Sequence, residues 1–467
     1  MPSASEPPMS SPASVSSPNV LELIGNTPLV RVSSLDTGPC QLFLKLENQN
    51  PGGSIKDRIG LSMIEAAEKE GKIKPGSTLI EATAGNTGLA LALVAARKGY
   101  RLLLVIPDKM SQEKIFHLRA MGAEVRMTRS DVGKGHPEYY QDLAQKLANE
   151  LGGYYINQFE NPANPRAHET TTGPEIWRQV GGKLDAVVCG VGSGGTISGL
   201  SRYFASVAPH VELVLADPRG SVLDAFVRTG ELGTAGSWLV EGVGEDFIPP
   251  ICDLSRVGAS YSIADEESFL TARELLSKEG ILGGSSTGLL VAAALRYCRS
   301  QTTPKRVVTF VCDSGNKYLS KMYNDFWMRE QGFLREAPRG DLRDVIARSA
   351  EQNSVVVVAP EDRLLVAYSR MKLYDVSQLP VLENDSIVGL LDESDLLLAL
   401  HDDPSAFQRP VKSIMSQKLV TVRVDASVES LIPVFERGLV VIVCDGPKFL
   451  GLITRIDVLN YLRRKLS

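Results

Sequence analysis

The fold is decided by residues 77–107, which read STLIEATAGNTGLALALVAARKGYRLLLVIP. Ser77–Ala82 and Arg101–Pro107 are short apolar runs that predict buried strands, and Asn86–Lys98 between them predicts a helix. The alternation continues with a predicted helix and a predicted strand, Ser111–Met121 and Ala123–Thr128. Strands that alternate with helices are typical of a mostly parallel sheet, so we predict an α/β fold.

This pattern continues to about residue 333 and then changes. Three more runs rich in Val and Leu suit strands buried on both faces, namely Asp185–Gly190, Val211–Ala216 and Arg306–Cys312. Gly332, Pro338 and Gly340 stand among charged residues, as is typical of a linker. We therefore predict four segments, which are a disordered tail over residues 1–18, a core over 19–333, a linker over 334–340 and a further domain over 341–467.

The last segment, residues 341–467, contains a weak internal repeat. Each unit has two short strands and a helix, with a Gly in the second strand and an Asp in the first turn of the helix. The predicted elements are Val376–Val381, Ile387–Leu391 and Glu393–Leu400 in the first unit, and Leu439–Cys444, Phe449–Ile453 and Arg455–Leu462 in the second. Two similar β-β-α units predict a pair related by a pseudo-twofold axis.

The composition argues against several classes of protein. The 467 residues include 22% charged residues and carry a formal net charge of -5, which gives no basic surface for nucleic acid. No apolar run approaches the roughly 20 residues that cross a bilayer, and Met1–Pro18 lacks the regions of a signal peptide. The histidines and cysteines show no metal-ligand spacing. We therefore expect a cytoplasmic protein with no metal site and with neither a membrane nor a nucleic acid as partner.

The first segment with chemical meaning is Pro51-Gly52-Gly53-Ser54-Ile55-Lys56-Asp57-Arg58, which places glycines just before a helix that stops at Gly71. Lys56 falls in the first turn of this helix, where a cation opposes the helix dipole. A lysine that is held there and partly desolvated has a lowered pKa, as a Schiff-base amine requires. A solvated surface lysine is the alternative interpretation.

Two further segments lie between a strand and a helix. The first is Glu81-Ala82-Thr83-Ala84-Gly85-Asn86-Thr87-Gly88, whose side chains and backbone N–H groups can hold a carboxylate. Simple helix capping explains the same residues equally well. In Gly190-Val191-Gly192-Ser193-Gly194-Gly195-Thr196-Ile197-Ser198-Gly199, N–H groups and hydroxyls can cradle a phosphate. This segment lacks the Lys of the Walker pattern, but a dinucleotide site stays open because Asp217 lies near the expected spacing of about 20 residues.

A fourth segment, Val311–Asn316, follows an apolar strand. Ligands bind beyond the carboxyl ends of parallel strands, so Ser314 could face the same crevice as the Gly-rich segments. A simple turn is the alternative interpretation.

Together and in this order, the four segments resemble the β-replacement family of pyridoxal 5′-phosphate (PLP) enzymes of fold type II. That family has a tryptophan synthase β-like fold with parallel sheets and includes cysteine synthases and cystathionine β-synthases. The resemblance covers about residues 19–333 and begins with Leu23-Ile24-Gly25-Asn26-Thr27-Pro28-Leu29. Residues 341–467 resemble a pair of CBS domains (a Bateman module), which often binds adenosine-type ligands. Such a pair on a PLP core is typical of cystathionine β-synthases.

The resemblance implies a role for each matching residue. Lys56 is implied to form the Schiff base with PLP and to act as the catalytic base, Asn86 to bind the 3′-oxygen, and Ser314 to face the pyridine nitrogen. The phosphate is implied to bind at Gly192, Ser193, Gly194, Gly195 and Thr196. The substrate carboxylate is implied to bind at Thr83, Ala84, Gly85, Thr87 and Gln158, and Gly242 and Gly244 to line the mouth for the second substrate.

The implied reaction joins L-serine to L-homocysteine, giving L-cystathionine and water, with hydrogen sulfide release from cysteine as a side reaction. Two departures favour the alternative of a cysteine synthase that uses O-acetylserine and sulfide. Ala84 stands where many relatives carry Ser, and Phe159 stands where many cystathionine synthases carry Tyr. A nucleotide sensor on an inactive core is a third hypothesis, which the intact Lys56 argues against. Met1–Pro18 contains no Cys or His, so we predict no haem.

The two CBS units differ at the position that commonly contacts a ligand. The second unit keeps the Gly-x-x-Thr-x-x-Asp pattern, with Thr454 and Asp457 as candidate contacts. The first unit has Asp392 in place of the Thr, and its carboxylate would repel a phosphate. We therefore expect at most one site for an adenosine-type ligand, and a purely structural pair is the alternative. The family also implies amino-acid substrates and a homodimer or homotetramer.

Overall fold

The computed structural model describes residues 19–466, apart from residues 84, 109–111, 134, 335–338 and 353. The chain divides into two compact units, Met1–Tyr323 and Asn324–Ser467, which are described separately below. Residues 324–333, which the sequence assigns to the core, therefore group with the second unit. The predicted tail at residues 1–18 lies outside the described residues.

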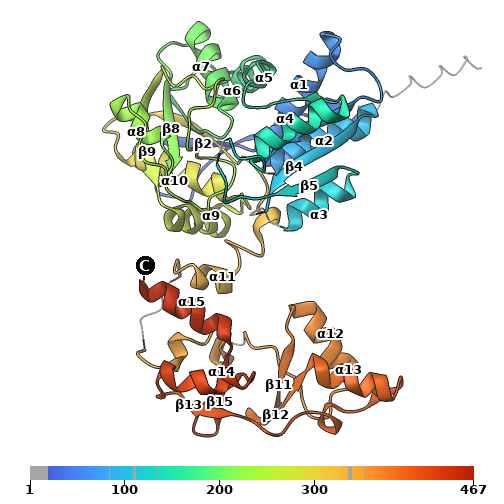
Figure 1. Ribbon diagram of the computed structural model, residues 1–467. Coiled ribbons are helices and arrows are strands. Elements are labelled where there is room, and N and C mark those ends of the chain that lie inside the picture. The colour runs from blue at the N-terminus through green and yellow to red at the C-terminus, as the bar shows by residue number, and fades with distance from the viewer. Residues whose placement is uncertain are drawn as a thin grey trace, which may run out of the picture. The chain divides into compact units, whose positions relative to one another are not determined.

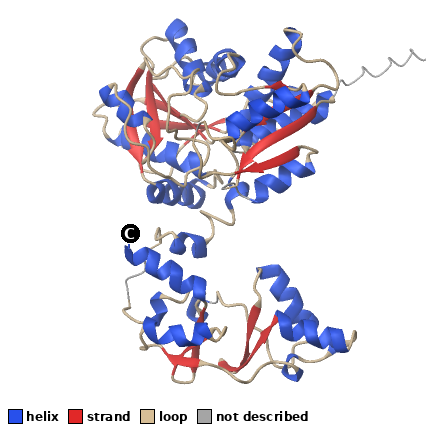
Figure 2. Ribbon diagram, in the orientation of Figure 1, coloured by secondary structure: helices blue, strands red, loops and turns tan. Residues whose placement is uncertain are grey.

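The first unit contains two sheets with helices packed against them (Figures 1 and 2). The smaller sheet has the strand order β5-β4-β3-β6, and all its pairs are parallel. Its strands are β3 (Thr78–Ala82), β4 (Arg101–Pro107), β5 (Glu124–Thr128) and β6 (Tyr154–Tyr155). β3 and β4 are nearly continuous apolar runs, which suits strands that are buried on both faces of a sheet.

The larger sheet has the strand order β1-β2-β10-β7-β8-β9. Only the pair of β1 and β2 is antiparallel among the described strands of this sheet. Its strands are β1 (Leu29–Arg31), β2 (Gln41–Lys45), β7 (Ala186–Gly190), β8 (Glu212–Pro218), β9 (Val257–Ile263) and β10 (Arg306–Phe310). The predicted α/β class with parallel sheets is therefore confirmed.

Ten α-helices belong to the described part of the first unit. They are α1 (Lys56–Lys69), α2 (Asn86–Lys98), α3 (Gln112–Ala120), α4 (Tyr140–Leu151), α5 (Ala163–Ala167), α6 (Gly173–Gln179), α7 (Gly195–Val207), α8 (Leu223–Thr229), α9 (Asp265–Glu279) and α10 (Ser285–Arg299). α1 packs on α2 beside the smaller sheet, and α10 packs on β10, β7 and β8 of the larger sheet. α2 has the predicted bounds, and its apolar side chains Leu89, Leu91 and Val94 are fully buried.

The second unit contains the two predicted β-β-α repeats, each with its own hydrophobic core. The first repeat has α12 (Leu364–Tyr374), the antiparallel strands β11 (Gln378–Glu383) and β12 (Ser386–Asp392), and α13 (Glu393–Asp402). The second has β13 (Thr421–Arg423), α14 (Ile432–Glu436), β14 (Val441–Asp445), β15 (Lys448–Ile453) and α15 (Arg455–Leu466). One further helix, α11 (Asp325–Glu330), opens the unit.

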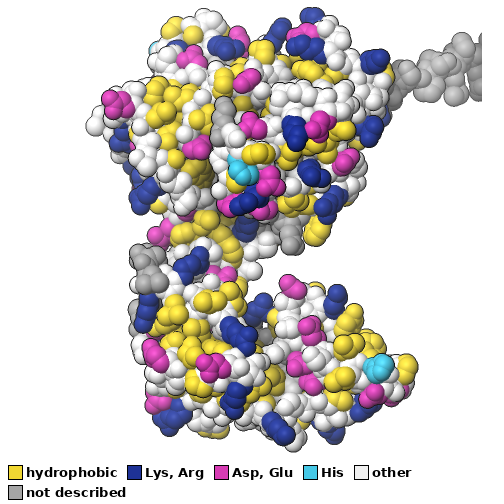
Figure 3. All heavy atoms as spheres, in the orientation of Figure 1, with side chains coloured by type: hydrophobic (Ala, Val, Ile, Leu, Met, Phe, Trp, Pro, Cys, Tyr) yellow, Lys and Arg dark blue, Asp and Glu magenta, His cyan; other side chains and the backbone are white. Residues whose placement is uncertain are grey.

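The visible faces of both units show acidic and basic side chains interspersed with one another (Figure 3). This mixture agrees with the small net charge of -5. None of the helices in the described parts of the chain is long and apolar enough to cross a membrane.

Candidate active site

A cavity of about 540 Å³ in the first unit lies at the turns that follow β3, β7 and β10. This is the edge where parallel sheets place their ligands. The cavity is lined by most of the predicted site residues, which are Lys56, Thr83, Gly85, Asn86, Thr87, Gln158, Gly192, Ser193, Gly194, Gly195, Thr196, Gly242 and Gly244. Ala84 lies outside the described residues, and Ser314 does not line the cavity.

Lys56 is the first residue of α1, as the glycines ahead of it predict. Its side chain lines the cavity together with that of Cys312. Burial lowers the pKa of Lys56, and the nearby Cys312, Asp313 and Glu245 oppose this effect only in part. A lysine amine with a lowered pKa carries less positive charge near neutral pH, so it can act as a nucleophile and as a base.

Asn86 is fixed in one orientation at the start of α2. Its Nδ2 donates to Asp313 Oδ2 at 2.8 Å, and its Oδ1 accepts from Lys317 Nζ at 2.9 Å. Tyr318 donates from its hydroxyl to the same Asp313 oxygen at 2.8 Å. Because the amide oxygen faces a cation and the amide nitrogen faces a carboxylate, a flipped amide would be repelled on both sides. The second N–H of Asn86 can therefore act as a donor of defined direction.

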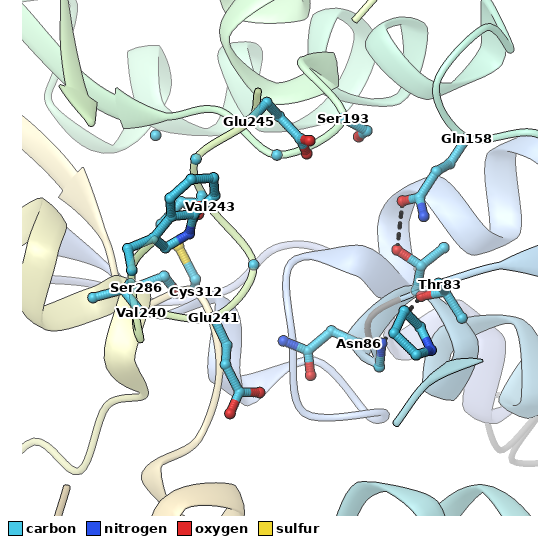
Figure 4. Close-up of a pocket in the computed structure, with 18 of the residues that line it drawn as sticks. Thr83, Asn86, Gln158, Ser193, Val240, Glu241, Val243, Glu245, Ser286 and Cys312 are labelled. Carbon is cyan, nitrogen blue, oxygen red and sulfur yellow. Dashed lines mark hydrogen bonds between the residues drawn. The ribbon is translucent and has the colours of Figure 1, made fainter. Parts of the chain in front are cut away.

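The turn after β3 is braced by a chain of hydrogen bonds, which Figure 4 shows in part. Thr87 Oγ1 donates to Gln158 Oε1 at 2.7 Å, and Gln158 Nε2 donates to the Ala82 carbonyl at 3.2 Å. Beneath the turn, burial raises the pKa of Glu81 to about 8, although backbone N–H groups donate to its carboxyl. Glu81 is thus largely neutral at pH 7 and adds no negative charge beneath a site for a carboxylate.

The Gly-rich turn between β7 and α7 lies so close to neighbouring residues that side chains on its glycines would clash. Gly194 has a φ of +86°, which favours glycine. A Cβ on Gly195 would lie 1.8 Å from Asn164 Oδ1, and a Cβ on Gly192 would lie 2.7 Å from the Gly242 carbonyl oxygen. Asn164 Nδ2 donates to Ser193 Oγ at 2.9 Å and so fixes that hydroxyl. The turn thus presents backbone N–H groups and hydroxyls to an anion at the start of α7.

Ser314 is not among the residues that line the cavity, and it caps a short 3-10 helix at Gly315–Tyr318. Its hydroxyl accepts from the Asn316 N–H at 3.3 Å. The serine that does line this part of the cavity is Ser286, in the first turn of α10, beside Cys312. Sequence reasoning missed Ser286, although Gly283-Gly284-Ser285-Ser286 has the same Gly-rich helix start as the segments that it selected.

A charged cluster that the sequence analysis also missed lies beside the predicted mouth of the cavity. Lys114 of α3 donates to Glu241 Oε2 at 2.5 Å, and Lys321 donates to Glu241 Oε1 at 2.7 Å. Burial would raise the pKa of Glu241, but the two lysines hold it below its usual range. Because Glu241 and Lys114 are 127 residues apart, no local pattern indicates that they meet.

In the second unit, the two repeats use the same local geometry with different residues. The Thr454 N–H and hydroxyl donate to Asp457 Oδ2 at 2.7 and 2.6 Å. Asp392 and Asp395 form a reciprocal capping box at the start of α13. Thr454 and Asp457 thus lie together, whereas the first repeat presents two carboxylates.

Comparison with known proteins places this architecture in a family. Residues 20–313 match the family of pyridoxal-phosphate dependent enzymes, and residues 343–402 and 411–464 match the CBS domain. The chain belongs to the pyridoxal-phosphate dependent enzymes, and it carries a C-terminal CBS pair. Within that class, its relatives of similar length are cystathionine β-synthases, and the chain belongs to that family of enzymes.

Three relatives show the range of similar proteins. A cystathionine β-synthase of Dictyostelium discoideum is 35% identical over 96% of this chain and 92% of its own length. Cysteine synthase 1 of Emericella nidulans is 40% identical over 68% of this chain and 88% of its own. The solved structure of an O-acetylserine dependent cystathionine β-synthase from Helicobacter pylori has a TM-score of 0.60 and 38% identity, and the match covers 65% of this chain and 97% of that one.

The residues of the cavity fit PLP. Cβ atoms on the glycines of the turn at Gly192–Thr196 would clash with neighbouring protein atoms, and Asn164 Oδ1 beside the turn is buried with no hydrogen-bond partner among the described residues. Lys56 supplies an amine of lowered pKa, and Asn86 supplies a directed donor. In the described parts of the chain, no group of three or more His, Cys, Asp or Glu side chains could hold a metal ion.

Gly195→Ala is expected to lower the affinity for PLP by about 100-fold, because the new methyl group displaces Asn164 or the start of α7. Fluorescence titration of the cofactor-free protein with PLP measures this effect. Gly133→Ala is the matched control, since a Cβ there meets nothing within 4 Å. Equal affinities of the two variants would contradict the assignment of this turn to the phosphate.

Proposed function

We propose that this chain condenses L-serine with L-homocysteine to give L-cystathionine and water. The main support is that cystathionine β-synthases align with it over nearly the whole length, through both the cavity and the CBS pair. Cysteine synthase 1 of Emericella nidulans aligns with 68% of this chain.

The residues of the cavity suit the steps of this reaction. PLP, when bound, supplies the electron sink that stabilises negative charge at the α-carbon. The Lys56 amine takes the proton from the α-carbon of serine and later returns it. Thr83, Thr87 and Gln158 hold the serine carboxylate at the start of α2. The bond from the β-carbon to oxygen breaks, a bond from the β-carbon to sulfur forms, and the hydroxyl leaves with the thiol proton as water.

Product analysis of the PLP-loaded protein tests this proposal. We expect cystathionine from serine plus homocysteine to form faster than cysteine from O-acetylserine plus sulfide, measured as kcat/KM in the two assays. A third assay with O-acetylserine plus homocysteine separates the preference for the amino-acid donor from the preference for the thiol. Faster formation of cysteine from sulfide would overturn the proposal.

A cysteine synthase that uses O-acetylserine and sulfide is the second candidate. Phe159 favours it, because this buried ring packs against Phe247 at 5.9 Å between ring centroids and offers no hydroxyl to the cavity. Release of hydrogen sulfide from cysteine is a side reaction that either candidate permits, since the β-carbon of cysteine loses its sulfur as sulfide and forms a new bond to the sulfur of a second thiol.

We also propose that Thr454 and Asp457 contact an adenosine-type ligand, as the CBS pair suggests. Their joint position at the start of α15 suits the hydroxyl groups of a ribose. Only the second repeat is proposed to bind, because Asp392 and Asp395 would repel a phosphate in the first. A homodimer or homotetramer is the assembly that we propose for the full chain.

A further inference from the structure

Lys114 of α3 lines the cavity, but the reaction described above gives it no role. Its side chain is only 3% exposed, and a lysine is rarely buried this deeply unless it is paired. Its Nζ donates to Glu241 Oε2 at 2.5 Å and to the Tyr318 hydroxyl at 3.2 Å. The buried ammonium group is thus held by side chains from two other parts of the chain.

The alkyl chain of Lys114 lies against the turn that is proposed to hold the carboxylate of serine. A Cβ on Gly85 would lie 2.7 Å from Lys114 Cδ, so a side chain at this position would displace the lysine. Gly85 has a φ of +130°, which favours glycine, and its N–H donates to Thr83 Oγ1 at 3.2 Å. Lys114 therefore supports the turn at the residue between Thr83 and Asn86.

Hydrogen bonds also connect Lys114 with Asn86 at the end of this turn. The Tyr318 hydroxyl, which accepts from Lys114, donates to Asp313 Oδ2 at 2.8 Å. The same Asp313 oxygen accepts from Asn86 Nδ2 at 2.8 Å, and the Asp313 side chain is fully buried. The orientation of Asn86 therefore depends on the same group of side chains that holds the Lys114 ammonium.

Glu241 provides a fixed point for Lys114 on the other side of the cavity, across from Thr83 in Figure 4. Its N–H donates to Ser285 Oγ at 3.0 Å, and the N–H groups of the two residues before it donate to Asp265 at 2.9 and 3.1 Å. α3 packs on α2 and β5 beside the smaller sheet, whereas α10, which begins at Ser285, packs on the larger sheet. The pair of Lys114 and Glu241 thus joins the two halves of the first unit across the cavity.

We infer that Lys114 is a positioning residue, which holds the turn at Gly85 in the conformation that binds the carboxylate of the amino-acid donor. This inference rests on the carboxylate site of the proposed function, and it applies to serine and to O-acetylserine alike. With Lys114 in place, the N–H groups and hydroxyls of the turn are ordered before the donor arrives. The donor then binds at a lower cost in conformational entropy.

Titration of the full-length, PLP-loaded protein with donor, followed by the change in the visible PLP band, measures binding apart from turnover. The two donors compared are serine and L-serinamide, in which a neutral amide replaces the carboxylate. In Lys114→Met, the ratio of the dissociation constant of serinamide to that of serine is expected to fall about 10-fold, because the displaced turn holds the carboxylate less well. Both donors are titrated on the same sample, so a partial loss of folded protein or of PLP lowers the signal but not the ratio.

Two further variants separate support of the turn from a direct attraction between Lys114 and the carboxylate. Glu241→Met removes the partner of Lys114, so support would be lost and the ratio is expected to fall, whereas a direct attraction by the released cation would raise it. The double variant of Lys114→Met and Glu241→Met is expected to show no larger fall than either single variant, because both remove the same bridge. Lys114→Arg keeps a cationic donor for Glu241 and is expected to restore part of the ratio.

Arg119→Met is the matched control, since Arg119 is exposed on the same helix and does not line the cavity. It is expected to keep the wild-type ratio. A ratio that is unchanged in Lys114→Met, or that rises in Glu241→Met, would overturn the inference and leave the proposed function in force. Because these titrations use no thiol, faster formation of cysteine from O-acetylserine plus sulfide would overturn only the proposed function.

Discussion

Lys56→Ala is expected to remove turnover and the visible absorbance of bound PLP together. A Schiff base to a lysine amine gives PLP its visible band, and no methyl group can replace that amine. The same amine is proposed to move the α-proton, so kcat is expected to fall about 10³-fold or more. Absorbance spectra after dialysis and steady-state rates with serine and homocysteine measure the two effects.

The structure explains why Lys56 differs from Lys69, the other lysine of α1. It lies in the first turn of α1, lines the cavity and has a pKa lowered by burial, whereas Lys69 in the last turn of α1 is exposed. Lys69→Ala is therefore the matched control and is expected to keep both the band and the rate. Lys56→Arg is expected to fail like Lys56→Ala, because a guanidinium stays protonated. A visible band that survives dialysis in Lys56→Ala would contradict the role of Lys56.

The sequence predicts well those parts of the fold that depend on local sequence patterns. α2 runs from Asn86 to Lys98 and β4 from Arg101 to Pro107, as predicted, because an apolar period and its Gly boundaries are local properties. The same reason applies to the two β-β-α repeats of the second unit, whose strands differ from the predicted bounds by only a few residues.

The direction of a side chain at the end of a strand is harder to predict. Ser314 and Ser286 both follow Gly-rich or turn-like sequence, yet Ser314 caps a 3-10 helix and Ser286 lines the cavity. The difference depends on backbone angles and on the packing of α10 against β10, which no local pattern specifies. The meeting of Lys114 with Glu241 depends in the same way on the arrangement of α3 and a distant loop.

Arg58→Met is expected to destabilise the first unit by about 3–5 kcal/mol. The Arg58 side chain is 2% exposed, and its partners Glu47 and Glu175 are 0% and 7% exposed. Arg58 Nε lies 2.7 Å from Glu47 Oε2, and Arg58 Nη2 lies 2.7 Å from Glu175 Oε2. Removal of the guanidinium leaves the two buried carboxylates with one paired cation in the described part of the chain, Lys45, which lies 2.7 Å from Glu175 Oε2, while Thr27 and Asn50 still donate to Glu47. Denaturant unfolding of wild type and variant measures the loss.

The pH dependence of stability gives a second measure of the same network. Burial would raise the pKa of Glu175, but Arg58 and Lys45 hold it at about 2, below its usual 4.5. A carboxyl whose folded pKa is depressed stabilises the fold above its unfolded pKa, and this contribution is lost as the pH falls from 4.5 towards 2. In Arg58→Met the folded pKa of Glu175 rises towards its usual value, so less stability is expected to be lost between pH 4.5 and pH 2 than in the wild type.

The control for this prediction is Arg178→Met, on the same helix as Glu175. Arg178 is exposed and donates to Asn26 Oδ1 at 2.9 Å, so its loss is expected to cost less than about 0.5 kcal/mol. Arg58→Lys keeps the charge but not the planar fork that binds both carboxylates, and an intermediate stability is expected. Because α1 carries both Arg58 and Lys56, the Arg58→Met variant is also expected to hold PLP less tightly. Equal stability of Arg58→Met and Arg178→Met would show that the buried network does not hold α1 in place.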